Sequence, residues 1–252
     1  MKFDLSAAWN DAMHLLRTNF ALLVPIAGIF FFLPTLIFTL SVTEMAEPAA
    51  NSSATQTLSL LLEYFQSLAP YFFLISIFAI AGNLTMLKLF LGGRDESVGS
   101  ALKAALILFL PAIIAQFLGS IIMFFGFMLL IVPGLYLSGR LALMSAVIAG
   151  ENEKNPINAI SRSWNLTENN GWWVFLYILI IGLVGAIIQA IISGITGVIL
   201  GFALSVDIAF TITSAIDAVL SAIVTTVTVC ATASIYRQFT GPKQQDYNEV
   251  FD

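Results

Sequence analysis

The sequence predicts an all-α protein, a polytopic transmembrane helical bundle of about six spans, with short interfacial amphipathic helices and both termini cytoplasmic. Three observations predict this class. Hydrophobic residues make up 59% of the 252 residues and charged residues only 10%, whereas soluble globular chains carry roughly 25% charged residues. Several apolar stretches reach the ~20 residues that a helix needs to cross hydrocarbon. The basic residues also gather in alternate connections between these stretches.

The expected spans lie within a single integral membrane domain, residues 1–252. In chain order they cover about 19–42, 70–91, 105–131, 134–150, 172–198 and 209–236. The fourth span is the shortest, and it contains Arg140. The Val132-Pro133-Gly134 sequence predicts a tight turn between the third and fourth spans. Acidic residues at positions 4 and 11 argue against a cleavable signal peptide before the first span.

Two short helices are expected at the membrane surface, each directly before a span. Residues 3–19 precede the first span, and the elbow helix 156–170 precedes the fifth. Asn155 suits the N-cap of the elbow helix and Pro156 its first position. Each helix contains a tryptophan, which indicates a repeated unit of an interfacial helix followed by a transmembrane hairpin. The segment 97–104 resembles a shorter third copy of this unit.

The loop between the first two spans is expected to hold one more helix. Residues 58–68 place Leu58, Leu61, Leu62 and Phe65 at helical spacing. This pattern predicts an amphipathic helix that lies on the outer leaflet or packs over the bundle.

The orientation follows from the distribution of Lys and Arg. One set of connections carries Lys2, Arg17, Lys88, Arg94, Lys103, Lys154, Arg162, Arg237 and Lys243. The opposite connections, residues 43–69, 132–134 and 199–208, carry none, so Arg140 alone is left over. Because basic residues remain on the cytoplasmic side, both termini are expected there, and the number of spans must be even.

The composition argues against several function classes. The formal charge of −5 comes without a basic stripe, so we expect no nucleic-acid partner. Cys230 is the only cysteine, which excludes an intrachain disulfide. His14 is the only histidine, so we expect no transition-metal site. No glycine-rich phosphate loop or nucleophile elbow appears, and we predict no catalytic residues and no cofactor.

Polar residues along two spans predict an intramembrane cluster. One face of the last span carries Asp217, Ser221, Thr225, Thr228 and Thr232, and one face of the fifth carries Gly182, Gly185, Gln189, Ser193 and Thr196. In lipid, such faces pack against other helices. Counted from the outer ends of their spans, Arg140 and Asp217 lie about 9 Å and about 8 Å deep. Arg140 is therefore expected to bond to Asp217 or to helix carbonyls, in a cluster with Gln189, Ser221 and Thr225.

Two interpretations of this cluster remain open. A charged side chain within the bilayer costs several kcal/mol unless it finds a partner. In the first interpretation, an ion pair with hydroxyl neighbours only fixes the register of the helices. In the second, the ion pair belongs to a ligand or ion pathway. A water-accessible cavity that reaches Arg140 would favour the pathway, and a packed, dry bundle would count against it.

A motif of about forty residues, from Pro133 to Trp173, carries a family resemblance. It contains PGLYLSGRLAL, a glutamate, AISRSWNLT and a tryptophan-rich entry to the next span. This resembles the YciC-like bacterial inner-membrane proteins and the membrane domain attached to some glycerophosphoryl diester phosphodiesterases. The resemblance implies a multi-pass protein of the bacterial inner membrane, whose catalytic residues, where a phosphodiesterase is attached, belong to a separate soluble domain. By motif position it selects a cytoplasmic elbow of Arg140, Glu151, Ser163, Trp164 and Thr167.

The expected function is that of a non-enzymatic integral membrane protein with a scaffold, partner-binding or lipid-interacting role. Short soluble loops, interfacial helices and the missing catalytic set favour it. The expected partners are membrane lipids, together with a membrane protein partner or another copy of the chain. The alternative is a small transporter or channel that uses the cluster around Arg140 and Asp217. An intramembrane enzyme would need a clustered carboxylate site, which the spacing does not show.

Overall fold

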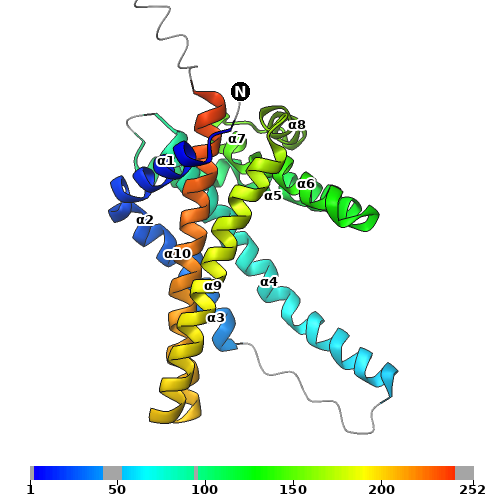
Figure 1. The fold of residues 1–252 in the computed structure, drawn as a ribbon, viewed down its shortest axis with the longest axis vertical. Coiled ribbons are helices and arrows are strands. Elements are labelled where there is room, and N and C mark those ends of the chain that lie inside the picture. Colours follow the sequence, from blue (N-terminus) through cyan, green and yellow to red (C-terminus); the bar gives the residue numbers. More distant parts are fainter. Residues whose placement is uncertain (1–2, 42–52, 94–95, 242–252) are drawn as a thin grey trace, which may run out of the picture.

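The computed structural model describes residues 3–41, 53–93 and 96–241, and every regular element in these ranges is helical. The expected all-α class is therefore confirmed. Figure 1 shows the arrangement of the elements. They are, in chain order, α1 (Leu5–Thr18), α2 (Phe20–Ala27), η1 (Gly28–Phe32, a π-helical turn), α3 (Leu33–Ser41), α4 (Ala54–Leu91), α5 (Val98–Leu129), α6 (Ile131–Leu141), α7 (Met144–Glu151), α8 (Pro156–Leu166), α9 (Gly171–Ala203) and α10 (Val206–Thr240).

Within the described ranges, six helical segments are long and apolar enough to cross a membrane, as expected. They are Phe20–Ser41, Ala54–Leu91, Val98–Leu129, Ile131–Glu151, Gly171–Ala203 and Val206–Thr240. The first joins α2, η1 and α3, and the fourth joins α6 and α7. In Figure 1, α9 and α10 run along the long axis of the molecule, whereas α6 runs across it.

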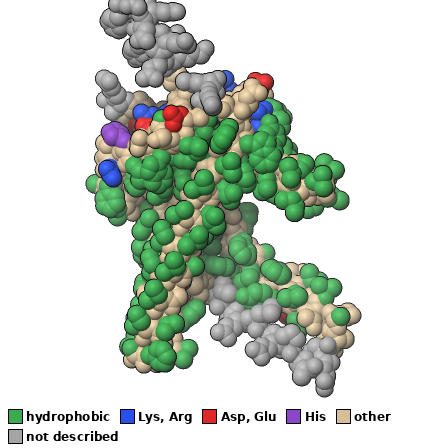
Figure 2. All heavy atoms as spheres, viewed as in Figure 1, with side chains coloured by type: hydrophobic (Ala, Val, Ile, Leu, Met, Phe, Trp, Pro, Cys, Tyr) green, Lys and Arg blue, Asp and Glu red, His purple; other side chains and the backbone are tan. Residues whose placement is uncertain are grey.

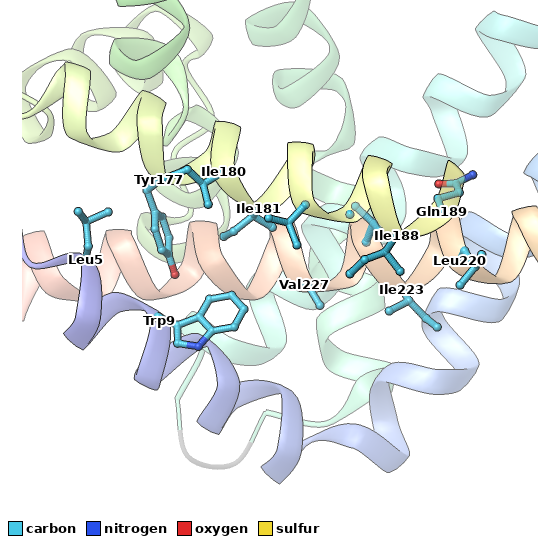
Figure 3. A pocket seen from close by; sticks show the side chains of 13 residues that line it. Leu5, Trp9, Tyr177, Ile180, Ile181, Ile188, Gln189, Leu220, Ile223 and Val227 are labelled. Atoms are coloured by element: carbon cyan, nitrogen blue, oxygen red, sulfur yellow. The ribbon is translucent and has the colours of Figure 1, made fainter. Parts of the chain in front are cut away.

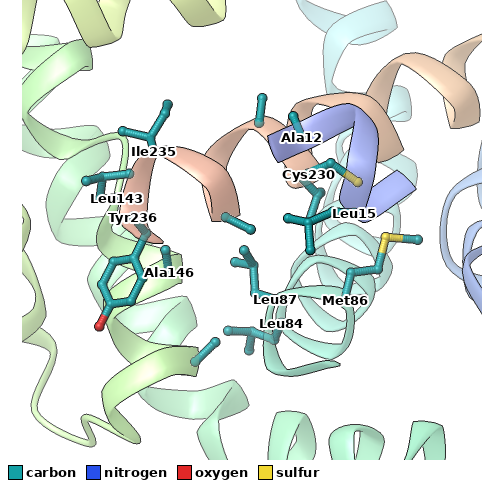
Figure 4. Packing of buried hydrophobic residues seen from close by; sticks show 14 of the residues in the cluster. Ala12, Leu15, Leu84, Met86, Leu87, Leu143, Ala146, Cys230, Ile235 and Tyr236 are labelled. Carbon is teal, nitrogen blue, oxygen red and sulfur yellow. The ribbon is translucent and has the colours of Figure 1, made fainter. Parts of the chain in front are cut away.

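The hydrophobic core lies at one end of the molecule. Figure 4 shows side chains of α1, α4, α7 and α10 meeting there, and all of them are buried. They include Ala12, Leu84, Leu87, Ala146 and Cys230. Alanines let helix backbones approach closely, which is how helices associate in lipid. Figure 2 places most visible charged side chains at this same end, which we call the charged end.

The N-terminal segment is tied to the charged end by specific contacts. Asp4 caps α1 by accepting from the backbone N–H groups of residues 6 and 7. The Phe3 N–H donates to Asn170 Oδ1 over 3.0 Å, at the start of α9. The Phe3 ring lies 5.7 Å from that of Tyr177 and 5.8 Å from that of Phe239. α1 is therefore held across α9 and α10, and the expected helix within residues 3–19 is confirmed.

Away from the core, the helices spread apart and expose large apolar side chains. The α5–α6 tip exposes Met128, Leu129 and Leu130 at 73%, 77% and 68%. At the α9–α10 turn, Phe202 is 90% exposed. Such surfaces are not compatible with water on a soluble monomer, and they suit hydrocarbon.

The separate helix expected at residues 58–68 is wrong, because α4 runs through it without a break. Ser53 and Gln56 form a capping box that starts α4 at Ala54. The helix then continues past Pro70 to Leu91, so the second span begins earlier than expected. Pro70 removes one backbone donor, and the helix on either side of it compensates for this loss.

The third copy of the repeated unit, expected at residues 97–104, is likewise not a separate helix. Ser97 caps α5, which continues through Pro111 to Leu129. The turn after it also differs from the expectation. It lies at Leu130, with φ −163° and ψ 154°, and Pro133 and Gly134 belong to the first turn of α6. Proline is tolerated there because the first N–H groups of a helix have no intrahelical partner.

The elbow helix forms where expected, as α8. Asn155 accepts from the N–H groups of residues 157 and 158, and Pro156 occupies the first position, as predicted. The helix ends at Leu166 rather than at residue 170. Asn169 adopts φ 61°, a left-handed conformation that turns the chain into α9.

Candidate functional site

Arg140 is buried at the charged end, where α6 meets α8. Its side chain is 4% exposed. One guanidinium nitrogen, Nη1, donates to the Thr167 carbonyl oxygen over 3.0 Å. The guanidinium carbon lies 4.3 Å from the ring centre of Trp164 and 5.7 Å from that of Tyr136. A cation over aromatic faces is stabilised even after it has lost water, so the two rings and the Thr167 carbonyl offset part of the cost of burying this charge. Arg140 Nε is buried without a hydrogen-bond partner among the residues that the structure describes.

The backbone of Arg140 is held by the same elbow. Ser163 Oγ donates to the Arg140 carbonyl over 2.8 Å. The single hydrogen of Thr167 Oγ1 is shared between the Ser163 carbonyl at 2.8 Å and the Arg140 carbonyl at 3.2 Å. The Leu143 N–H in turn donates to Ser163 Oγ over 3.2 Å. These bonds bridge the break between α6 and α7, where backbone groups lack helical partners. The motif residues Arg140, Ser163, Trp164 and Thr167 are therefore brought together.

Glu151, the remaining motif residue, lies in a second contact at the end of α7. Its Oε1 accepts from Arg162 Nε over 2.9 Å and from the Tyr236 hydroxyl over 3.1 Å. The contact joins α7, α8 and α10. Both side chains of the ion pair are partly exposed, at 48% for Arg162 and 33% for Glu151, so the pair itself adds little stability.

The expected pair of Arg140 and Asp217 is wrong. Arg140 lies beside Gly171 at the start of α9, where a Cβ would be 2.8 Å from its Cδ. Asp217 instead accepts a hydrogen bond from Ser193. The 22 residues of α9 between Gly171 and Ser193 span about 33 Å. The other expected partner, a main-chain carbonyl, is the one found. Depth counting failed because α6 crosses the molecule and breaks from α7.

The polar stripes of α9 and α10 meet at Ser193 and Asp217, whereas the sequence predicted only that each stripe packs against another helix. Ser193 bonds to Asp217, and two turns along, a Cβ on Gly185 would lie 2.7 Å from the Val224 side chain. Ser221 and Thr225 follow Asp217 by one and two turns, and both are half-buried. Asp217, Ser221 and Thr225 thus belong to the α9–α10 contact and not to a cluster with Arg140.

An apolar groove of about 580 Å³ runs along α9 and α10 beneath α1. In Figure 3, Leu5 and Trp9 of α1 lie at one end and Gln189 of α9 lies toward the other. Between them, the lining consists of aliphatic side chains and Tyr177. Gln189, expected in the polar cluster, therefore borders a hydrophobic groove.

Two further hollows continue this groove over α10. One, of about 390 Å³, lies against α2 and η1 and shares Ile223 with the groove. The other, also about 390 Å³, shares Leu220 with the groove. Val219 and Phe32 line both of the smaller hollows. We call the three together the α10 trough, a continuous apolar surface with α9 on one side and α2 and η1 on the other.

Sequence reasoning missed the α10 trough, although its residues recur at helical spacing. Val219, Leu220, Ile223, Val224 and Val227 follow α10 beside the hydroxyl stripe. In a membrane helix, however, apolar side chains at this spacing also face bulk lipid. Only the positions of α2 and α9 make this face concave.

The fold and its apolar surfaces define a multi-pass helical membrane protein. The chain belongs to the family described as a domain of unknown function, DUF7847, whose model matches residues 4–239. Comparisons with curated proteins and with solved structures give no match. The resemblance to YciC-like proteins is tested by none of these comparisons and stays a prediction.

Proposed function

We propose that this protein is a non-enzymatic, lipid-interacting protein of the cell membrane, and that the α10 trough holds acyl chains of membrane lipids. The observation that carries the proposal is that the three hollows adjoin one another in pairs. Ile223 lines both the groove and the hollow beside α2, Leu220 lines both the groove and the other small hollow, and Val219 lines both small hollows. A linear hydrocarbon chain fits a long apolar surface of this kind, and its contacts are dispersion contacts with many side-chain atoms.

The surroundings of the trough suit a phospholipid. Trp9 lines the groove from α1 and is 43% exposed, and tryptophan favours the region of the lipid head groups. Phe20 lines the hollow beside α2. Arg17 precedes it by one turn and is exposed, so its charge can contact a lipid phosphate. α1 then lies at the membrane surface, with acyl chains beneath it.

Filling the trough should remove the bound lipid. Ile223 is 54% exposed and lines two of the three hollows. We expect Ile223→Trp to reduce the lipid retained by the purified protein by about fivefold or more, because the indole occupies space meant for an acyl chain. Native mass spectrometry measures the retained lipid.

Ile195→Trp is the matched control, since Ile195 is 56% exposed and lines none of the three hollows. Retention by this variant should equal that of the unaltered protein. Equal retention by both variants would rule out the trough as the lipid site.

We further propose that the charged end faces the cytoplasm of a bacterial cell, with the protein in the inner membrane. The described residues contain seven basic side chains, all in α1, in α8 or at helix ends near them. They are Arg17, Lys88, Lys103, Arg140, Lys154, Arg162 and Arg237. Arg140 was the one basic residue that the expected layout left outside the cytoplasmic connections. Because it lies at the charged end, it now supports a cytoplasmic position for that end.

Cysteine accessibility checks this layout. In a Cys230→Ala background, an impermeant thiol reagent added to intact cells should label Asp207→Cys, at the start of α10, and spare Lys154→Cys. After the membrane is opened, Lys154→Cys should react. Leu130→Cys should stay unlabelled in both cases, because the α5–α6 tip carries no polar side chain from Ile121 to Leu135 and belongs in hydrocarbon. Labelling of Lys154→Cys in intact cells would reverse the orientation.

A further inference from the structure

A second cavity, of about 690 Å³, lies among α4, α5, α6, α7, α9 and α10. Its lining differs from that of the α10 trough. Six uncharged polar side chains reach it, from five different helices, and none of the charged residues that the structure describes lines it. They are Asn83, Gln116, Ser138, Ser145, Thr228 and Thr232. We propose that this cavity binds a neutral amphiphile through a hydroxyl head group, as in a diacylglycerol.

The hydrogen-bond pattern of the lining favours a ligand that donates. Thr228 and Thr232 donate to the carbonyl oxygens of residues 224 and 228, both over 2.9 Å. Ser138 donates to the Leu135 carbonyl over 2.7 Å. Each of these hydroxyl groups has used its one hydrogen, so only its oxygen remains for a ligand.

The two amide side chains add further acceptors. Asn83 Oδ1 is buried and has no hydrogen-bond partner, which leaves the cost of its desolvation uncompensated. Gln116 Nε2 donates one hydrogen to Ser145 Oγ over 3.3 Å, so this amide offers its Oε1 together with its second N–H. A ligand hydroxyl near Asn83 would satisfy the buried acceptor.

The absence of a charged lining residue favours a neutral head group. A bare ion would lose its hydration without gaining an opposite charge, which is costly in a low dielectric. An anionic head group beside Ser138, Thr228 and Thr232 would face hydroxyl oxygens whose hydrogens are already donated to backbone carbonyls. The cavity volume also exceeds what a bare ion occupies, since one water molecule takes about 30 Å³ of liquid.

The cavity opens sideways toward the apolar surface of the molecule. Leu179 and Leu183 of α9 line it and are 45% and 56% exposed. On α10, Thr232 lies eight residues before Thr240, the last residue of the helix. The polar side chains are therefore about 12 Å from the charged end. A lipid can therefore place its hydroxyl among the polar side chains and leave its chains in hydrocarbon. This site also gives a role to Thr228 and Thr232, which the sequence placed on the polar stripe.

Photo-crosslinking tests the proposal. The full chain, in nanodiscs of neutral phospholipid, receives a photoactivatable diacylglycerol, the same molecule with its hydroxyl acetylated, or a benzoquinone with the same chain. We expect the diacylglycerol to label peptides that contain Met123, Phe175 or Leu183. The acetylated and quinone probes, which cannot donate, should label these peptides about fivefold less, the effect of roughly one hydrogen bond.

Variants test the residues that carry the site. Asn83→Leu and Thr232→Val should each reduce labelling by about fivefold, whereas Thr211→Val, on an exposed turn of α10, should not. Thr232→Val keeps the side-chain volume, so it remains informative if Asn83→Leu does not fold. Ile223→Trp should leave this labelling unchanged, which separates the cavity from the trough. Equal labelling by all three probes would overturn the proposal. Diacylglycerol labelling that is the same in Asn83→Leu, Thr232→Val and the unaltered protein would also overturn it.

Discussion

Replacement of Arg140 by leucine is expected to lower the free energy of unfolding by about 3 kcal/mol, and replacement of Asp217 is not expected to restore it. Arg140 loses a charged hydrogen bond to the Thr167 carbonyl, of roughly 1.5–3 kcal/mol. It also loses the contact with Trp164 at 4.3 Å, of up to about 2 kcal/mol when desolvated. Relief from burying the charge offsets part of this loss.

The double variant Arg140→Leu/Asp217→Leu distinguishes the two possible partners. If the charges were paired, removal of both would recover stability. Because about 33 Å of α9 separates their contacts, the two single effects should instead add. Unfolding of the purified protein in detergent, followed by circular dichroism, gives the free energies.

Variants of the elbow provide the complementary test. Thr167→Val keeps the carbonyl acceptor and removes the hydroxyl that donates to the Ser163 and Arg140 carbonyls, so a loss of about 1 kcal/mol is expected. Trp164→Leu removes the aromatic face and should couple with Arg140→Leu, since the two side chains are in contact. A double variant of Arg140 and Asp217 that is more stable than the sum of the two single effects predicts would show that the ion pair exists.

Replacement of Gly139 by alanine is expected to cost about 2–3 kcal/mol, although alanine favours helices. A Cβ at Gly139 would collide with the carbonyl oxygen of Gly171 and would lie 2.9 Å from the Phe175 Cβ. Both groups belong to α9, and a backbone carbonyl cannot rotate away as a flexible side chain can. Separation of α6 from α9 is the remaining response, and it loosens the contacts around Arg140. Overpacking of a close contact typically costs about 1–3 kcal/mol.

Gly194→Ala is the matched control. Gly194 also lies in a membrane-spanning helix, α9, but a Cβ at this position would meet no atom within 4 Å. It should be neutral or slightly stabilising, by up to about 1 kcal/mol from helix propensity. Thermal unfolding in one detergent compares the two variants. A Gly139→Ala protein as stable as Gly194→Ala would mean that α6 and α9 do not meet backbone to backbone.

The sequence was sufficient for features that depend on neighbouring residues. Apolar length and the distribution of charge predicted six spans, and Asn155 and Pro156 marked the start of α8 as the structure has it. The motif also selected Ser163, Trp164 and Thr167, which the structure places around Arg140. Periodicity along a helix encodes which face is polar, so the polar faces of α9 and α10 were predictable, although the helices that they contact were not.

Only the tertiary structure decided how these elements are arranged in space. The depth of Arg140 depends on α6 crossing the molecule and on the break before α7, whereas residue counting assumes a straight span. Lipid-facing and trough-lining residues are equally apolar, so Ile223 became part of a groove only when α2, η1 and α9 flanked α10. The sequence determines the spans because hydrophobicity acts residue by residue, and packing decides the sites because concavity requires several helices at once.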